Sequence, residues 1–279
     1  MEEKWTAVIE PKGSSFFGEI RELWEYRQLI KMFIKRDFKT MYAQTILGPL
    51  WFLLHAFLSS FVMNVVFGKI AGISTDGIPG FLFYMSGNIL WNDFSGCLSS
   101  VSGTFTSNVR LMGKVWFPRM CVPIANVLSR QIRFFIEFAL FLCMYLLYGR
   151  ASVGTMLSGR LLLLPLLLLL SMALSMGVGM ILSSVTIKYR DLTVLIGFLL
   201  QIWMYATPIV YPMSQVPNDL QWLLMLNPMA SIVESFRCVL FGGTIPTEAL
   251  LISVAITAVL LLTGMLAFHR AQRNFLDTV

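Results

Sequence analysis

Six segments of this chain are so apolar that a water-soluble fold has no place for them. They cover residues 49–68, 81–101, 122–148, 161–185, 193–212 and 248–268. An α-helix needs about 20 apolar residues to cross the hydrocarbon of a bilayer. The chain is 57% hydrophobic and only 13% charged, which leaves too little polar surface to cover a soluble protein of 279 residues. We therefore predict an all-α membrane protein with six transmembrane helices.

A seventh apolar segment, residues 220–241, is also long enough to cross a membrane. It carries Asn227 and Pro228 at its middle, and Glu234 and Arg237 beyond them. Proline breaks helices, and a charge that faces lipid is costly. Irregular backbone at this depth is tolerated only where protein or water covers it. The sequence therefore predicts two re-entrant half-helices between spans five and six, in which Glu234 and Arg237, one turn apart, pair with each other.

The basic residues predict the orientation, because Lys and Arg accumulate in cytoplasmic loops. Six spans with both termini inside divide the 21 Lys and Arg residues into 17 inside and four outside. A seventh span would move the basic residues of the tail, 269–279, to the outer side. Residues 1–48 show no apolar stretch with a cleavage site, so we expect this region to be retained in the cytoplasm. The transmembrane domain is then 49–268.

Three of the predicted cytoplasmic segments mix basic and apolar residues. In the first, about residues 19–38, an apolar stripe predicts an amphipathic helix at the membrane interface. The stripe consists of Ile20, Leu23, Trp24, Ile30, Phe33 and Ile34. The others are NVRLMGKVWFPR at 108–119 and IKYRDL at 187–192. Such segments either lie on the membrane or dock in a groove of a partner, and a solvated loop that only obeys the charge rule is the alternative.

Nothing in the sequence predicts catalysis by this chain. An enzyme in the membrane would need clustered acids, a histidine base or metal ligands. The two histidines, His55 and His269, stand far apart, and the four cysteines stand singly without CxxC spacing. The chain also lacks the GxxxxGK[ST] motif, so we expect it to hydrolyse no nucleotide. We predict no catalytic residue and no metal site.

Five segments, taken in order, resemble a known family. They are RDFKTMYAQTILGPLW at 36–51, the 108–119 and 187–192 segments above, ATPIVYP at 206–212 and LNPM at 226–229. Together they are similar to the permease subunits of bacterial ABC exporters for polysaccharides, of the O-antigen, capsule and teichoic-acid type. The resemblance extends from about Arg21 to the C-terminus, and each single segment is a weak signal.

The resemblance implies a transport subunit in the bacterial inner membrane that moves a lipid-linked polysaccharide. It implies two partners, an ABC ATPase subunit in two copies and a second copy of this chain, in contact with membrane lipid. ATP and Mg²⁺ would bind to the ATPase, and this chain would carry no cofactor and bind no nucleic acid. The alternative is an exporter of a small drug or lipid with the same fold. A membrane enzyme of polyprenyl-linked glycan synthesis is a remote alternative.

The resemblance also assigns residues to roles. Contact with the ATPase would involve Asn108, Arg110, Lys114, Val115, Phe117, Pro118, Arg119, Lys188, Tyr189, Arg190 and Asp191. The amphipathic helix would line a substrate entrance that contains Arg27, Lys31, Lys35, Arg36 and Lys39. These cations would attract a diphosphate, although anionic lipid of the inner leaflet explains them equally well. An outer gate would consist of Pro208, Tyr211, Pro212, Asn227, Pro228, Glu234 and Arg237.

Aromatic and polar residues within the spans are candidates for the transport pathway. They are Trp51, Tyr84, Asn88, Trp91, Asn92, Asp93, Trp203 and Tyr205. For each aromatic residue, packing against lipid or another helix is the alternative to contact with a sugar. An ionisable residue such as Asp93 inside a span faces protein or water, so a structural hydrogen bond competes with a role in the pathway.

Overall fold

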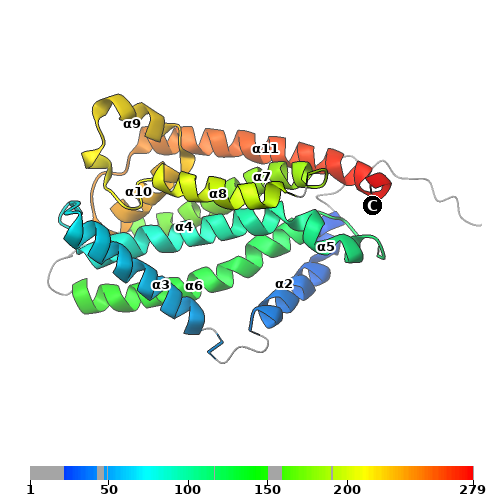
Figure 1. Ribbon diagram of the computed structural model, residues 1–279, viewed down its shortest axis with the longest axis horizontal. Coiled ribbons are helices and arrows are strands. Elements are labelled where there is room, and N and C mark those ends of the chain that lie inside the picture. The colour runs from blue at the N-terminus through cyan, green and yellow to red at the C-terminus, as the bar shows by residue number, and fades with distance from the viewer. Residues whose placement is uncertain are drawn as a thin grey trace, which may run out of the picture.

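The computed structural model describes residues 22–42, 47–48, 50–115, 117–149, 159–189 and 191–278, and these residues contain helices and no strand. Long helices lie side by side along the molecule (Figure 1). The elements are α2 (Arg27–Tyr42), α3 (Leu50–Met63), the π-helix η1 (Asn64–Ile70), α4 (Gly80–Ser102), α5 (Thr104–Met112), α6 (Cys121–Gly149), η2 (Gly159–Leu162), α7 (Leu163–Thr186), α8 (Leu192–Tyr205), η3 (Met213–Gln215), α9 (Asn218–Met225), α10 (Pro228–Phe241) and α11 (Thr247–Thr278). For the described residues, the predicted all-α class is confirmed.

Four helical segments among the described residues are long and apolar enough to cross a membrane. They are Leu50–Ile70, Cys121–Tyr148, Arg160–Thr186 and Thr247–Gln272. A fifth is present if α9 and α10, which meet at 99°, count as one span. Each of the six predicted spans contains a helix, but α4 is less apolar over its 23 residues and α8 has only 14 residues.

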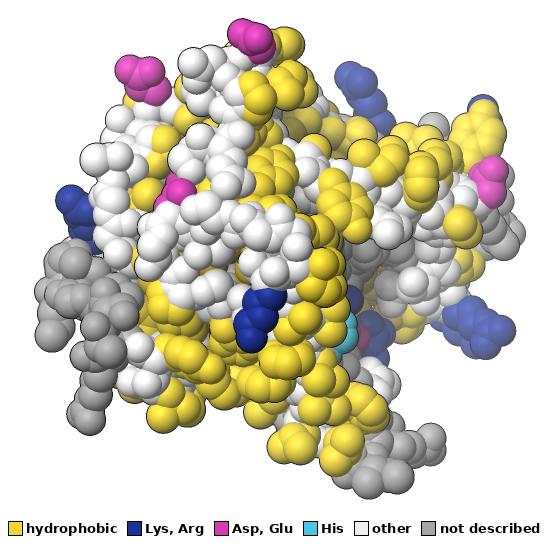
Figure 2. Space-filling view, turned by 60° about the vertical axis from the view of Figure 1, so that its left-hand side comes forward, with side chains coloured by type: hydrophobic (Ala, Val, Ile, Leu, Met, Phe, Trp, Pro, Cys, Tyr) yellow, Lys and Arg dark blue, Asp and Glu magenta, His cyan; other side chains and the backbone are white. Residues whose placement is uncertain are grey.

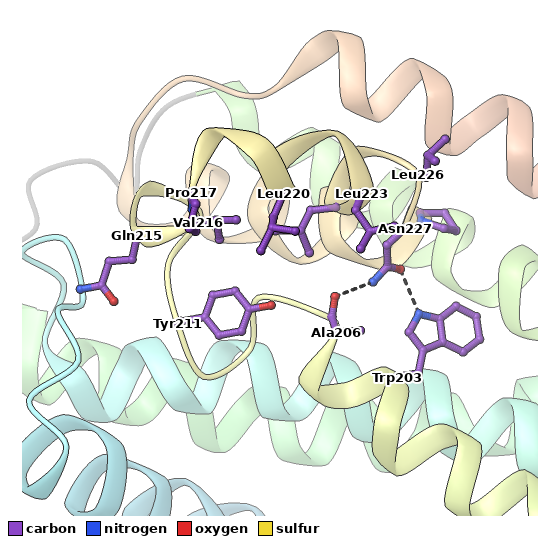
Figure 3. Close-up of a pocket in the computed structure, with 12 residues that line it drawn as sticks. Trp203, Ala206, Tyr211, Gln215, Val216, Pro217, Leu220, Leu223, Leu226 and Asn227 are labelled. Carbon is purple, nitrogen blue, oxygen red and sulfur yellow. Dashed lines mark hydrogen bonds between the residues drawn. The ribbon is translucent and has the colours of Figure 1, made fainter.

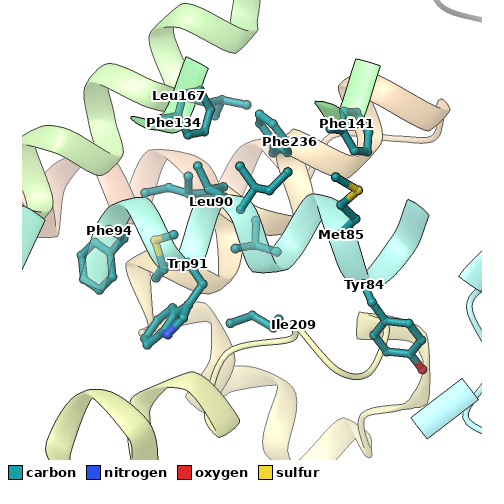
Figure 4. Close-up of a cluster of buried hydrophobic side chains, with 14 of the residues drawn as sticks. Tyr84, Met85, Leu90, Trp91, Phe94, Phe134, Phe141, Leu167, Ile209 and Phe236 are labelled. Atoms are coloured by element: carbon teal, nitrogen blue, oxygen red, sulfur yellow. The ribbon is translucent and has the colours of Figure 1, made fainter. Parts of the chain in front are cut away.

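The helix α4 is the centre of the bundle, where it packs against α3, α6, α7 and α10. Of its 23 residues, 17 are buried. Figure 4 shows its Leu90 among Phe134 and Phe141 of α6, Leu167 of α7 and Phe236 of α10. Protein surrounds α4 on most sides, so its polar residues meet other side chains instead of lipid.

The helices α7 and α11 approach each other closely through glycines. A Cβ atom on Gly177 would lie 2.7 Å from the backbone nitrogen of Leu261, and one on Gly264 would overlap the carbonyl oxygen of Gly177. Small residues let helix backbones come together in membranes. These two helices therefore form one rigid side of the bundle.

Three predicted boundaries differ from the structure. The interface helix, predicted for residues 19–38, continues to Tyr42, and its residues 19–21 lie outside the described part. Span five, predicted for 193–212, ends as a helix at Tyr205, three residues before Pro208, which has no backbone N–H for a helical bond. The predicted cytoplasmic tail, 269–279, continues α11 as a helix to Thr278, and Phe268 just before it stacks on Phe105 of α5 at 4.7 Å.

Hydrophobic side chains cover much of the outer surface. Figure 2 shows one face on which they form a broad area, with few charged side chains among them. Large exposed apolar residues stand on α3, α6, α8 and α11. On α8, only Ile196 and Leu200 are buried. A surface of this kind requires a bilayer or another protein as its neighbour.

Candidate functional site

The segment 108–119 lies at the end of the molecule where α5 and the C-terminal part of α11 meet (Figure 1). We call this the basic end, after Arg110, Lys114, Lys188 and Arg270, which are all exposed there. The backbone of Asn108 is not helical, with φ −117° and ψ 17°, so α5 kinks at this residue. Beyond the kink, Arg110 and residues 113–115 are exposed.

Only part of the 108–119 segment is accessible. Val115 is 56% exposed, whereas Phe117 and Pro118 are buried. The ring of Phe117 meets Phe33 of α2 edge to face at 5.7 Å, and the Arg119 guanidinium donates a hydrogen bond to the carbonyl of Gln272. Burial lowers the pKa of Arg119 from its usual value, and the group still keeps its proton at neutral pH. One half of the segment is thus an anchor and the other half is an accessible surface.

The turn at 187–192 lies beside the start of α5. The Thr186 hydroxyl donates a hydrogen bond to the carbonyl of Ser102 at 3.1 Å. Lys188, Tyr189 and Asp191 are exposed, and the Lys188 ammonium lies 5.4 Å from the Tyr189 ring centroid. The structure thus brings the 108–119 and 187–192 segments, to which the resemblance assigns contact with the ATPase, to the same end of the molecule. Arg190 lies outside the described residues.

The predicted entrance residues of α2 divide into two groups. Arg27, Lys31, Lys35 and Lys39 are exposed on the face that turns away from the bundle. The same face carries Trp24, which is 75% exposed, so this member of the predicted stripe does not pack on the bundle. The stripe that packs on the bundle is centred on buried Phe33 and includes Leu29 and Tyr26, which the periodicity did not identify.

Arg36 differs from the other entrance residues in its contacts. Its guanidinium lies 4.9 Å from the Phe33 ring centroid and bonds to Asp37 at 2.8 Å. It therefore faces a cavity next to the bundle, which Arg130 of α6 also lines.

The polar residues of α4 hold helices together. The amide of Asn88 donates to the hydroxyls of Ser59 and Ser60 on α3, at 2.6 and 3.3 Å. The carboxylate of Asp93 accepts two hydrogen bonds from Gln131 of α6, at 3.2 and 3.3 Å. Both residues are buried, and both bond across a helix contact. These contacts favour the structural interpretation over a role in the pathway.

A buried layer of charges continues from Asp93 along α6. Arg133 and Glu137 form an ion pair at 2.7 Å, and a small cavity lined by both also contains Asn92. The amide nitrogen of Asn92 is buried and makes no hydrogen bond to any described residue. Gln131 was not among the predicted site residues, although it stands between Arg130 and Arg133 near the start of α6.

The aromatic pathway candidates also divide into two groups. Tyr84 and Trp91 are buried, and the Trp91 ring packs with Phe94 and Trp203 at centroid distances of 5.4 and 6.4 Å. Buried rings have no face free for a sugar in this conformation. Trp51 and Tyr205 are 52% and 57% exposed and keep accessible faces.

At the end opposite the basic end, Asn227 organises the predicted outer gate. Its Nδ2 donates to the carbonyl of Ala206 at 3.0 Å, and its Oδ1 accepts from the Trp203 indole at 3.0 Å (Figure 3). The same oxygen accepts from the backbone N–H of Met229, which caps α10 at Pro228. One side chain therefore joins the ends of α8, α9 and α10.

An apolar cavity of about 670 Å³ opens beside Asn227. Tyr211 lies on one side of it, and Leu220 and Leu223 of α9 lie on the other (Figure 3). The Tyr211 hydroxyl donates to the carbonyl of Tyr205 at 3.2 Å, and Pro212 precedes the short helix η3. The chain between α8 and α9 is thus fixed by local contacts.

The predicted pair of Glu234 and Arg237 is wrong. The Arg237 guanidinium is buried and donates to the carbonyls of Pro208, Ile209 and Phe83, with distances of 2.8 Å to Ile209 and 3.4 Å to Phe83. It also lies 3.7 Å from the Phe83 ring centroid. Because the turn after α8 leaves the carbonyls of Pro208 and Ile209 without helical partners, they are available as acceptors for this guanidinium.

The described residues contain no group of three His, Cys, Asp or Glu side chains placed to hold a metal ion. The geometry is that of helices held at fixed contacts, with an accessible basic surface at one end and a folded-back helix pair at the other.

The family model of ABC-2 type transporters matches residues 28–241. The chain is 27% identical over 264 residues to the O-antigen export system permease protein RfbA of Myxococcus xanthus, a match that covers 93% of this chain and 98% of that protein. It is 24% identical over 250 residues to the protein of the same name from Klebsiella pneumoniae, covering 89% and 94%. It is 23% identical over 244 residues to the polysialic acid transport protein KpsM of Escherichia coli, covering 87% and 93%. This chain is a multi-pass membrane protein that belongs to the ABC-2 type transporter family.

Proposed function

We propose that the chain is the permease subunit of an ABC exporter that moves a lipid-linked polysaccharide, such as O-antigen or capsule, across the bacterial inner membrane. One observation carries the proposal: the similarity to an O-antigen export permease covers 93% of this chain and 98% of that protein. The match therefore extends over nearly the whole length of both proteins and is not limited to one shared segment. A relative named for polysialic acid transport, covered to 93%, also handles a polysaccharide.

The proposal includes six membrane crossings. Four are the long apolar helical segments named above, and the other two are α4 and α8, which do not meet the criteria of length and apolar composition. In Figure 1 both helices run alongside the four long apolar ones. Arg110, Lys114, Lys188 and Arg270 gather at one end, which we assign to the cytoplasm because basic residues are retained there. Both termini then lie in the cytoplasm, and α9 and α10 enter the outer leaflet and turn back at Asn227.

A separate ATPase that binds ATP and Mg²⁺ would dock at the basic end. The exposed Arg110, Lys114 and Val115 offer charge and one apolar side chain to a groove of that partner. Phe117 packs on α2, and Arg119 bonds to α11. A displacement of the exposed half is therefore transmitted to α2 and α11. Two ATPase subunits would act on two copies of this chain.

The cargo is tested by deletion of this chain in its host. If the chain exports a polysaccharide, polymer linked to undecaprenyl diphosphate accumulates inside the cell, because its head and glycan cannot cross the hydrocarbon unaided. Immunodetection of the polymer before and after permeabilisation measures this. Normal surface polymer in the deletion strain would contradict the proposal and favour export of a small drug or lipid.

Docking is tested by three substitutions on the exposed half, Arg110→Glu, Lys114→Glu and Val115→Asp. We expect the combined variant to lose co-purification with the ATPase while it still folds, because none of these side chains is buried. Arg270→Glu reverses one charge at the same end outside the segment and serves as the control. Retained co-purification of the triple variant would exclude this surface as the docking site.

A further inference from the structure

The small cavity in the buried layer of charges lies between α4 and α6 and contains about 10 Å³ of free space. It is lined by Asn92 and Asp93 of α4 and by Arg130, Arg133, Phe134 and Glu137 of α6. All of these side chains except that of Phe134 are polar or charged. Apolar cavities in proteins stay empty, whereas a polar cavity of about 10–15 Å³ has room for one water molecule. The size of the cavity therefore limits its occupant to a molecule as small as water.

The amide nitrogen of Asn92 is an unsatisfied group at this cavity. It is enclosed by protein and donates to no described residue. A buried donor without an acceptor is destabilising, and buried polar groups that lack a protein partner are commonly bonded to an ordered water. The occupant must therefore offer an acceptor to this amide.

The carboxylates at the cavity set a second requirement. Asp93 accepts from Gln131 at 3.2 and 3.3 Å, and Glu137 accepts from Arg133 at 2.7 Å. Each carboxylate oxygen can accept more than one hydrogen bond, so both groups keep capacity for a further donor. An occupant that accepts from Asn92 and donates to a carboxylate satisfies both requirements.

The charges around the cavity argue against an ion as the occupant. Two arginines and two carboxylates line the cavity, so their formal charges cancel. Arg133 and Glu137 are paired directly, at 2.7 Å. An added cation or anion would be a buried charge without compensation, which is far more costly than a buried neutral molecule that is hydrogen-bonded. Water is the smallest neutral molecule that both donates and accepts.

We propose that one ordered water molecule occupies this cavity and bridges α4 and α6, accepting a hydrogen bond from Asn92 and donating one to Asp93 or Glu137. Together with the direct bond between Asp93 and Gln131, it gives these two helices a second polar link inside the membrane. The contact between α7 and α11 differs, because the two backbones approach so closely at Gly177 that even a Cβ atom finds no space. The proposal concerns how the helices are joined and does not depend on the proposed cargo.

Radiolytic labelling of the full chain in lipid nanodiscs tests the proposal. X-ray pulses convert a bound water into a hydroxyl radical that oxidises the nearest side chain, and peptide mass spectrometry measures the oxidation of each ring. Phe134 lines the cavity and is only 4% exposed. Phe141 of the same helix is fully buried among other rings, and Phe81 is 8% exposed at the start of α4. We expect Phe134 to be oxidised several times faster than either of these controls.

The three rings of the unmodified chain already decide between bound and bulk water. Oxidation that follows the exposed fraction, fastest in Phe81 and slowest in Phe141, would overturn the proposal, because the radicals would then come from bulk water. This comparison needs no variant, so it holds even if a substitution in the charged layer prevents folding.

Two substitutions at Asn92 test its role as a ligand of the water. Leucine is apolar and larger than asparagine, so Asn92→Leu removes the donor and fills the space, and the oxidation of Phe134 should fall to that of Phe141. Asn92→Ala is the matched control, because it removes the same donor but enlarges the cavity, so water stays beside the carboxylates and Phe134 remains oxidised. Undiminished oxidation of Phe134 in Asn92→Leu would overturn the proposal. An equal loss in both variants would overturn the bridge to the carboxylates.

Discussion

The helices α4 and α8 miss the usual criteria for a membrane crossing for opposite reasons. α4 is long enough, at 23 residues, but contains Asn88, Asn92 and Asp93. α8 is apolar throughout but has 14 residues. α4 has protein on most sides, with 17 buried residues, whereas α8 buries only Ile196 and Leu200. The polar residues of α4 therefore have protein neighbours, whereas the apolar, exposed face of α8 has none among the described residues.

A matched pair of phenylalanines tests this comparison with the largest expected effect. Phe94 of α4 is fully buried, and Phe198 of α8 is 60% exposed. Phe94→Ala should lower the free energy of unfolding by about 3–5 kcal/mol because it leaves a cavity. Phe198→Ala should change the free energy of unfolding of the single chain by about 0.5 kcal/mol or less. Thermal unfolding followed by size-exclusion chromatography measures both. A large loss in Phe198→Ala would mean that α8 is packed against a second copy in the purified protein.

Arg237 links the two helices and carries the next largest effect. It bonds to Phe83 of α4 and to Pro208 and Ile209, which follow α8. Arg237→Leu should destabilise the chain by about 3 kcal/mol, since it leaves buried carbonyls without donors. Arg160→Leu removes one exposed hydrogen bond, to Gly243 at 2.8 Å, and is the control with a small effect. Equal melting temperatures of the two variants would show that the turn after α8 is not held by Arg237.

Two glycines extend the comparison to backbone contacts. Gly177→Ala should cost about 1–3 kcal/mol, because its Cβ would press on the backbone of α11. Gly197 of α8 has nothing within 4 Å of such a Cβ atom, so Gly197→Ala should stabilise the helix by up to about 1 kcal/mol. Opposite shifts in melting temperature are expected. Destabilisation by Gly197→Ala would instead place another protein surface against α8.

The sequence predicted those parts of the fold that depend on local composition. The long apolar helices follow from hydrophobic length, and the bend near Asn227 follows from the proline beside it. The contacts that hold the chain after α8 were not predictable in this way, because the carbonyls of Pro208 and Ile209 bond to Arg237 in another helix. The spacing within α10 predicted Glu234 as the partner of Arg237. In the folded chain the guanidinium bonds instead to the carbonyls of Pro208 and Ile209, which are distant in sequence.

The candidate site was predictable to the same extent. The topology gathered the two basic segments at one end, but it could not show that Phe117 is buried on α2 while Val115 is exposed. Likewise, the stripe of the interface helix included Trp24, which the packing of α2 on α6 turns outward. Both features depend on contacts between segments that are distant in sequence, to which periodicity is insensitive.

The smallest effect concerns the hydrogen bond that ties the end of α8 to the bundle. Trp203→Phe should keep most of the packing on Phe94 but lose the bond to Asn227, at a cost of about 1 kcal/mol. Trp222→Phe on α9 is the control, because Trp222 is 60% exposed and makes no hydrogen bond to a described residue through its side chain. Asn227→Ala also removes the cap of α10, so this variant should lose more stability than Trp203→Phe does. In the double variant with Trp203→Phe, the two losses should fall short of additivity by about 1 kcal/mol, the energy of the shared bond. Full additivity would mean that the indole and Asn227 do not interact.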